Sequence, residues 1–146
     1  MNFIIKNKKA YFDYTIIDTY SAGIQLVGTE VKSILNSKVS ISEAHCSIIN
    51  NELFIIGMNI SKFENIKHTN HEPNRVRKLL LKRLEINKLS KSVKEKGLTI
   101  IPLSIFLSDT KFIKIEIGLV KGKKNYDKKN TLKLKDIDRE MKSNIN

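Results

Sequence analysis

The sequence has no tryptophan, one cysteine and only two prolines among its 146 residues. Cys46 has no partner for an internal disulfide, which is typical of a protein kept in a reducing compartment, so we expect a cytoplasmic location. No apolar run is long enough to cross a membrane. The N-terminus is too short and too soon charged to be a signal peptide. These absences exclude disulfide-stabilised secreted proteins and helical membrane proteins.

Recognisable catalytic and metal-binding patterns are also missing. The chain has no glycine-rich phosphate loop, no nucleophile elbow and no paired-carboxylate motif, so we expect no enzymatic activity and no cofactor. Four potential metal ligands have a spacing that matches no zinc site, and we expect no metal. They are His45, Cys46, His68 and His71. We interpret His71 as a residue that shapes its loop.

Positive charge is abundant, and its excess over negative charge is confined to two segments. The net charge is +12, and 75–96 holds nine lysines or arginines against two acids. From Lys121 to the end there are nine against four, and the remainder carries nine of each. Two separate basic segments favour a polyanionic partner that the protein binds at two places. Nucleic acid is the first candidate, and an anionic membrane is the rival.

The first half of the chain predicts short strands around one helix. Aromatic and β-branched residues at 11–17 indicate a strand, and the alternation at 22–27 indicates another after a break at Ser21. The segment 28–35 then predicts a helix with Thr29 as N-cap and a glutamate in its first turn.

Two hairpins are predicted, one on each side of a helical segment. The first joins strands at 44–49 and 53–57 through Asn-Asn, and the second joins 98–107 to an alternating strand at 113–119 through Ser-Asp-Thr.

Between the hairpins, two apolar stripes out of phase with each other predict two helices after Pro73. The break lies near 83–85, and Gly97 ends the second helix. Three consecutive leucines in the first of these helices are expected in the core. They are Leu79, Leu80 and Leu81.

Short strands with a few helices in one small domain favour a mainly β fold, an OB-like antiparallel β-barrel with flanking helices. We expect residues 1–120 to form this body and 121–146 a basic tail. The tail lacks a core pattern, so we expect it to be disordered when free and helical from about Thr131 when bound. A monomer is expected.

Several strings, in this order and spacing across nearly the whole chain, resemble the SsrA-binding protein family, small protein B of bacterial trans-translation. They are Asn7-Lys8-Lys9-Ala10, Asp13-Tyr14, Ala22-Gly23-Ile24, Gly28-Thr29-Glu30-Val31-Lys32-Ser33, residues 70–81, Glu95-Lys96-Gly97-Leu98-Thr99 and residues 122–129.

The resemblance implies an OB-like barrel that binds the tRNA-like domain of transfer-messenger RNA (tmRNA). It also implies that protein and RNA enter stalled ribosomes together, with the tail in the vacant small-subunit decoding site and the mRNA path. The implied RNA-binding residues are Gly23, Glu30, Lys32, Arg75, Arg77 and Lys78. The implied decoding-site residues are Gly122, Lys123, Lys124, Tyr126, Asp127, Lys128 and Lys129, the last of which stands where the family usually has arginine.

Plainer interpretations stay open at several positions. Glu30 also fits a simple first-turn helix residue, and the basic residues 75–78 also fit a solvated helix face. Two other functions compete with the adaptor: a generic single-strand-binding OB module, which needs exposed aromatics for stacking, and a peripheral membrane protein that uses the basic tail. The tail has no tryptophan or phenylalanine to anchor it in a membrane.

Overall fold

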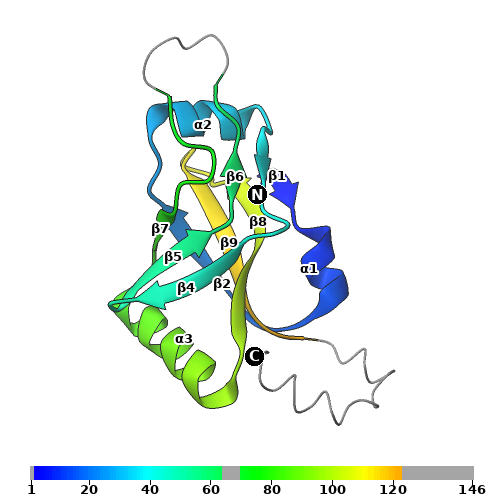
Figure 1. Ribbon diagram of the computed structural model, residues 1–146, viewed down its shortest axis with the longest axis vertical. Helices are drawn as coiled ribbons and strands as arrows, with labels where there is room; N and C mark the ends of the chain where they lie inside the picture. Colours follow the sequence, from blue (N-terminus) through cyan, green and yellow to red (C-terminus); the bar gives the residue numbers. More distant parts are fainter. Residues whose placement is uncertain (1, 64–69, 123–146) are drawn as a thin grey trace.

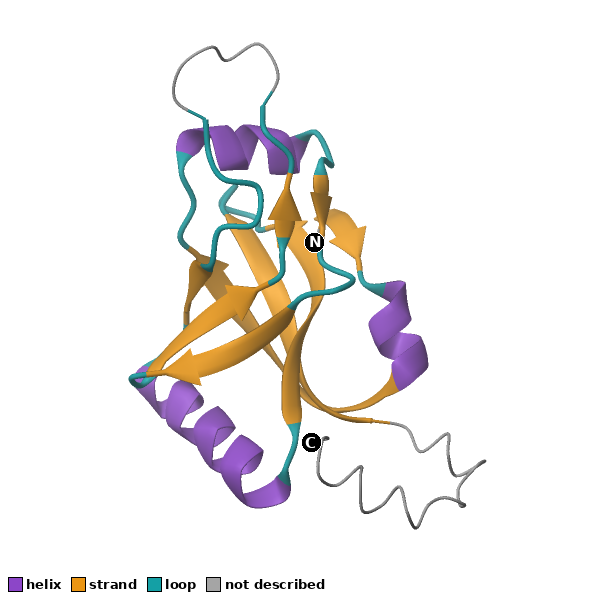
Figure 2. Ribbon diagram, viewed as in Figure 1, coloured by secondary structure: helices purple, strands orange, loops and turns teal. Residues whose placement is uncertain are grey.

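The computed structural model describes residues 2–63 and 70–122, which form strands with helices on the outside (Figures 1 and 2). The strands are β1 (Asn2–Lys6), β2 (Tyr14–Ile24), β3 (Val39–Ser40), β4 (His45–Ile49), β5 (Glu52–Ile56), β6 (Asn59–Ile60), β7 (Arg77–Leu80), β8 (Thr99–Leu107) and β9 (Ile113–Gly122). The helices are α1 (Lys8–Asp13), α2 (Gly28–Leu35) and α3 (Arg83–Lys96).

Seven of the strands form one antiparallel sheet in the order β1-β8-β4-β5-β7-β2-β9. Because β8 also pairs with β9, the sheet nearly closes into a ring, and β1 pairs with the C-terminal part of β8. Strands β3 and β6 pair separately. The expectation of a mainly β protein with a few helices is therefore confirmed.

The core lies inside the ring. The alternation of β9 is confirmed, since Ile115, Ile117 and Leu119 are buried in the main cluster of apolar side chains. Each such side chain, fully buried, stabilises the fold by roughly 1.5–3 kcal/mol. Leu53 and Ile55 of β5 fill the same interior from the opposite wall. The ring is thus a packed core rather than an open channel.

Both predicted hairpins and the predicted extent of the α2 helix are confirmed. Asn50 and Asn51 have φ angles of 53° and 64°, the left-handed values of a tight hairpin turn. Gly97, with a φ of 66°, ends α3 as predicted. The N-cap of α2 was predicted wrongly, because Val27 and not Thr29 precedes the first helical residue.

The helix predicted through 76–84 is wrong. Residues 77–80 instead form β7, which lies between β5 and β2 and so joins the two halves of the ring. The run of leucines fits a strand as well as a helix, because Leu79 points into the core while Leu80 is 45% exposed. The segment is a strand rather than a helix because its pairing with β5 and β2 closes the sheet. Only one helix follows, and it begins at Arg83, within the predicted break.

The strand predicted at 11–17 is displaced, and Ser21 does not interrupt it. Residues 8–13 form α1, and β2 then runs without a break from Tyr14 to Ile24. Asn7 is the reason, since its buried side chain accepts from the Ala10 N–H and donates to the Pro102 carbonyl at 2.9 Å. The cap starts the helix and ties it to β8. Strand β1 was not predicted.

The helices lie around the ring at separate places. Figure 1 shows α2 at one end, α3 at the opposite end and α1 at the side. No described helix has the length and hydropathy needed to span a bilayer. Strand β9 continues through Gly122, which pairs with Tyr14, so the sheet runs two residues past the predicted end of the body.

Candidate nucleic-acid interface

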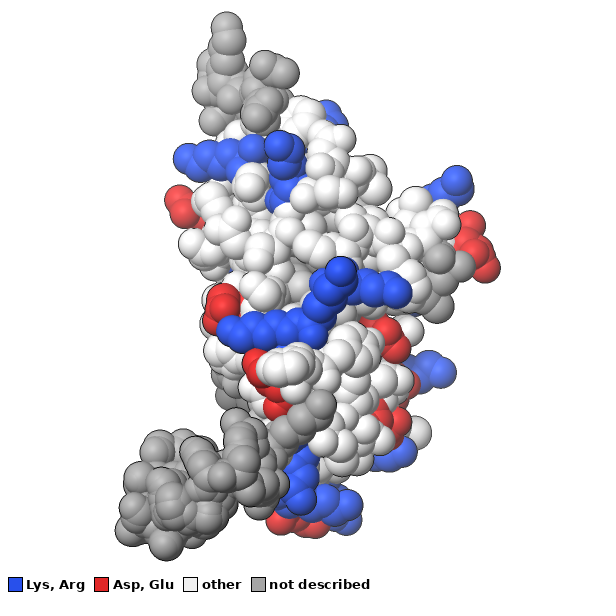
Figure 3. All heavy atoms as spheres, turned by 90° about the vertical axis from the view of Figure 1, so that its right-hand side faces the viewer, with Lys and Arg blue, Asp and Glu red and all other residues white. Residues whose placement is uncertain are grey.

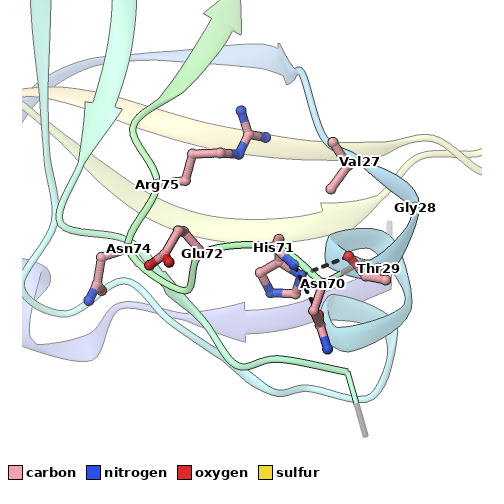
Figure 4. Close-up of a pocket in the computed structure, with 8 residues that line it drawn as sticks. All are labelled: Val27, Gly28, Thr29, Asn70, His71, Glu72, Asn74 and Arg75. Carbon is pink, nitrogen blue, oxygen red and sulfur yellow. Dashed lines mark hydrogen bonds between the residues drawn. The ribbon is translucent and has the colours of Figure 1, made fainter. Parts of the chain in front are cut away.

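A groove of about 720 Å³ opens at the N-terminal end of α2, where this helix meets the segment that leads into β7 (Figure 4). The start of α2 forms one wall and residues 70–75 form the other. The lining residues are Val27, Gly28, Thr29, Asn70, His71, Glu72, Asn74 and Arg75. The groove therefore combines a helix N-terminus with one of the predicted RNA-binding arginines.

Behind the groove, Glu30 is completely buried and joins the start of α2 to the segment 75–77. One carboxylate oxygen accepts from the Val27 N–H at 2.9 Å and from Arg75 Nη2 at 2.6 Å. The other accepts from Arg75 Nε at 3.0 Å and from Arg77 Nε at 2.7 Å. Glu30 therefore caps α2 from a buried position and also fixes an arginine that was predicted to bind RNA.

Arg77 is the buried partner of Glu30 and is itself 0% exposed. Its Nη1 donates to the carbonyls of Met58 and Arg75, and its Nη2 donates to the carbonyls of Glu72 and Pro73. With the bond from Nε, all five N–H donors of the guanidinium are used inside the protein. Arg77 therefore holds residues 72–75 in place and has no donor left for a ligand.

Arg75 shares the same carboxylate but faces outward, with a side chain that is 38% exposed. Its bidentate contact with Glu30, and a longer one from Nη2 to the Gln25 carbonyl at 3.4 Å, fix the plane of the guanidinium. Within residues 2–63 and 70–122, Nη1 of Arg75 has no hydrogen-bond partner. A fixed arginine with one free edge is a suitable donor to a phosphate.

The ionisation of this cluster follows from its contacts. Burial favours a raised pKa for Glu30, but the hydrogen bonds from Arg75, the Val27 N–H and Arg77 outweigh it and hold the pKa at about 2. The bond to Glu30 raises the pKa of Arg75. Burial lowers the pKa of Arg77, although Glu30 opposes the shift. The carboxylate is thus firmly ionised near neutral pH.

His71 connects the two walls of the groove and is only 6% exposed. Its Nε2 lies 2.9 Å from the Ile60 carbonyl, and its Nδ1 lies 2.8 Å from the Thr29 hydroxyl oxygen (Figure 4). The sequence reasoning assigned His71 to loop shaping but missed the pairing with Thr29. No motif links these residues, which are 42 positions apart, so only the fold reveals the contact.

The other predicted RNA-binding residues lie outside the lining of the groove. The Lys32 ammonium lies 5.5 Å from the centroid of the Phe63 ring, and Lys78 forms an ion pair of 3.0 Å with Glu52. Gly23 lies on β2 between β7 and β9. Gly122 ends β9. The remaining decoding-site residues lie outside the described residues, as does His68. They are Lys123, Lys124, Tyr126, Asp127, Lys128 and Lys129.

Positive charge at the other end of the ring is arranged differently. Exposed lysines of α3 include Lys88, Lys91, Lys94 and Lys96, and none has a hydrogen bond or ion pair within the described part of the chain.

On the side that carries α1 and β1, Figure 3 shows cations and acids interspersed with broad uncharged areas. No three potential metal ligands come together among the residues that the structure describes.

These features define a small, basic, mainly β binding protein with a fixed arginine at the edge of a groove. The SmpB protein family model matches residues 4–146, so the chain belongs to the SmpB family. This is a family of RNA-binding proteins and not of enzymes, and the family membership confirms the expectation that the chain is not an enzyme.

Several curated relatives support the assignment, and each is named SsrA-binding protein. The protein of Cytophaga hutchinsonii is 53% identical over 96% of this chain and 92% of its own length. The protein of Fusobacterium nucleatum is 51% identical over 95% and 93%. A solved structure, "tmRNA-SmpB: a journey to the center of the bacterial ribosome", has a TM-score of 0.71 and 38% identity, covering 87% of this chain and 89% of that one.

Proposed function

We propose that this protein is the tmRNA-binding adaptor of trans-translation, which binds the tRNA-like domain of tmRNA and brings it to stalled ribosomes. Membership in the SmpB family carries this conclusion. The partners are therefore tmRNA and the ribosome, and the protein acts in the cytoplasm. We further infer that the nearly closed ring is an OB-like barrel, a fold that commonly presents nucleic-acid-binding surfaces.

The groove beside α2 is the principal contact to the tRNA-like domain in this proposal. Arg75 donates to a backbone phosphate from its free Nη1, while Glu30 and Arg77 act behind it as positioning residues. Lys32 of α2, Lys78 of β7 and Gly23 of β2 extend the contact in this proposal. Phosphate contacts from fixed side chains set the register of a protein on RNA without reading its sequence.

Binding to a folded RNA tests this function directly. The full chain should bind a transcribed tRNA-like domain at least tenfold more tightly than an unstructured RNA of the same length at 0.15 M salt. Equal affinity for the two would instead support a generic single-strand-binding module. Preferential pelleting with anionic vesicles would support the membrane alternative.

The tail contributes to ribosome rescue rather than to RNA affinity in this proposal. A chain that ends after Gly122 keeps the pairing of β9 with Tyr14 and should retain the affinity for the tRNA-like domain. It should fail in an in vitro rescue assay on ribosomes stalled without a stop codon, because Tyr126 and its neighbouring lysines are missing. Full rescue by the shortened chain would contradict this part.

A further inference from the structure

The groove contains one hydrogen-bond acceptor whose orientation is fixed by a buried side chain. Nε2 of His71 lies 2.9 Å from the Ile60 carbonyl oxygen, which can only accept, so Nε2 carries the proton. In the neutral ring Nδ1 then has a lone pair, and the hydroxyl of Thr29, 2.8 Å away, donates its hydrogen to it. The buried histidine thus takes up the only donor that Thr29 has in its side chain.

With its hydrogen engaged, Thr29 Oγ1 can only accept from a ligand. Among the described residues no N–H or O–H group donates to this oxygen. Gly28 leaves the adjacent position open, since a Cβ built there meets nothing within 4 Å. Thr29 itself is partly exposed at the groove lining. A ligand group that reaches this oxygen from the groove therefore has to be a hydrogen-bond donor.

This requirement excludes the phosphate as the partner of Thr29. Phosphate oxygens accept hydrogen bonds and would be repelled by the lone pairs of Oγ1, whereas Arg75 lines the same groove and can donate to them from Nη1. A nucleotide with one acceptor group for Arg75 and one donor group for Thr29 matches the pair. The sugar–phosphate backbone of RNA has both, because its 2′-hydroxyl donates, and the backbone of DNA lacks the donor.

We propose that Thr29 is a specificity-determining residue that distinguishes RNA from DNA by accepting a hydrogen bond from a ribose 2′-hydroxyl, and that His71 is the positioning residue that keeps Oγ1 in its accepting orientation. The inference rests on the proposed function, since it assigns one atom of the groove to one chemical group of the bound RNA. Arg75 supplies affinity for the backbone, and Thr29 supplies the discrimination against deoxyribose.

The test is an interference experiment with the full chain and a transcribed tRNA-like domain that carries 2′-deoxynucleotides at sparse, random positions. Bound and unbound pools are sequenced for the wild-type protein, Thr29→Val and Thr29→Ser. Valine has the shape of threonine without the hydroxyl, and serine keeps the hydroxyl. Thr19→Val is the matched control, because Thr19 is an exposed threonine of β2 outside the groove.

For the wild type we expect at least one position at which a 2′-deoxynucleotide weakens binding about fivefold to tenfold, the effect of one lost hydrogen bond. Thr29→Val should bind the all-ribose RNA more weakly by a similar factor and lose the interference at that position alone. Thr29→Ser and Thr19→Val should keep the wild-type profile. His71→Gln should weaken the same interference signal without removing others.

Identical interference profiles for the wild type and Thr29→Val would overturn the proposal. Weaker binding by Thr29→Val with every deoxy effect retained would also overturn it, because Oγ1 would then accept from a base. Thermal melting confirms that each variant is folded, and if His71→Gln does not fold, the valine and serine variants decide alone. Failure of the wild-type protein to bind the RNA would reject the proposed function instead, so the two failures are distinguishable.

Discussion

The two ends of the ring hold their positive charge in opposite ways. Next to α2, Arg75 and Arg77 share the buried carboxylate of Glu30 and are fixed by short hydrogen bonds. At the other end, the lysines of α3 extend from an exposed helix face without hydrogen-bonded partners among the residues described. A fixed arginine presents its donors at one place and one angle, whereas free lysines attract any polyanion in a salt-dependent manner. Specific recognition is therefore expected at the α2 end.

The largest expected effect is on stability, from Arg77→Met. The change removes five internal hydrogen bonds and one member of a buried ion pair, so the free energy of unfolding should fall by roughly 3–5 kcal/mol. The melting temperature should fall by about 10 °C or more. Arg83→Met is the matched control, because Arg83 is exposed and donates once, to the Asn51 carbonyl, and it should cost less than about 1 kcal/mol. Equal losses would show that Arg77 is not a structural residue.

Low pH should destabilise the cluster at the α2 end, because it protonates the Glu30 carboxylate that pairs with Arg75 and Arg77. Its pKa is lowered from 4.5 to about 2, so the stabilisation is fully present above pH 4.5 and is lost as the pH falls through the folded value. We expect about 3 kcal/mol to be lost from this group between pH 5 and pH 2. Urea unfolding at each pH measures it. Glu30→Gln should flatten this slope, whereas Glu43→Gln, at an exposed ion pair, should leave it unchanged.

Arg75→Gln should separate binding from stability. Because Arg77 still pairs with Glu30, the fold should survive with a change of about 1 kcal/mol. Affinity for the tRNA-like domain should fall about tenfold, the loss expected for one charge-assisted contact to phosphate. Fluorescence anisotropy measures the affinity, with Arg83→Gln as the control for the loss of one arginine elsewhere. Equal weakening by both variants would mean that net charge, not the fixed guanidinium, drives binding.

The smallest effect is expected from the α3 end. Replacing Lys88, Lys91 and Lys94 together with glutamine should reduce affinity for the isolated tRNA-like domain by less than about threefold at 0.15 M salt. The slope of log affinity against log salt should change little. Titrations at several salt concentrations provide both values. A larger loss than that of Arg75→Gln would place the main RNA contact on α3.

The sequence by itself determined much of this protein. Alternating apolar residues specified β9, the Asn-Asn pair specified a hairpin, and Gly97 specified the end of α3, because each signal is local and has one structural solution. The ordered strings 7–10 to 122–129 specified the family. The charge pattern also identified 75–96 as basic. It could not show that part of this charge lies at the α2 end of the ring and part at the α3 end.

Only the tertiary structure decided the remainder. Residues 77–80 are a strand because they complete the sheet between β5 and β2, a contact that no local pattern contains. Arg75 and Arg77 look alike in the sequence, yet one points outward and the other is buried with every donor used. Glu30 lies 45 positions from the first and 47 from the second, and Thr29 lies 42 from His71. Hydrogen bonds across such separations depend on how the whole chain packs, so the fold alone determines which cation faces the ligand.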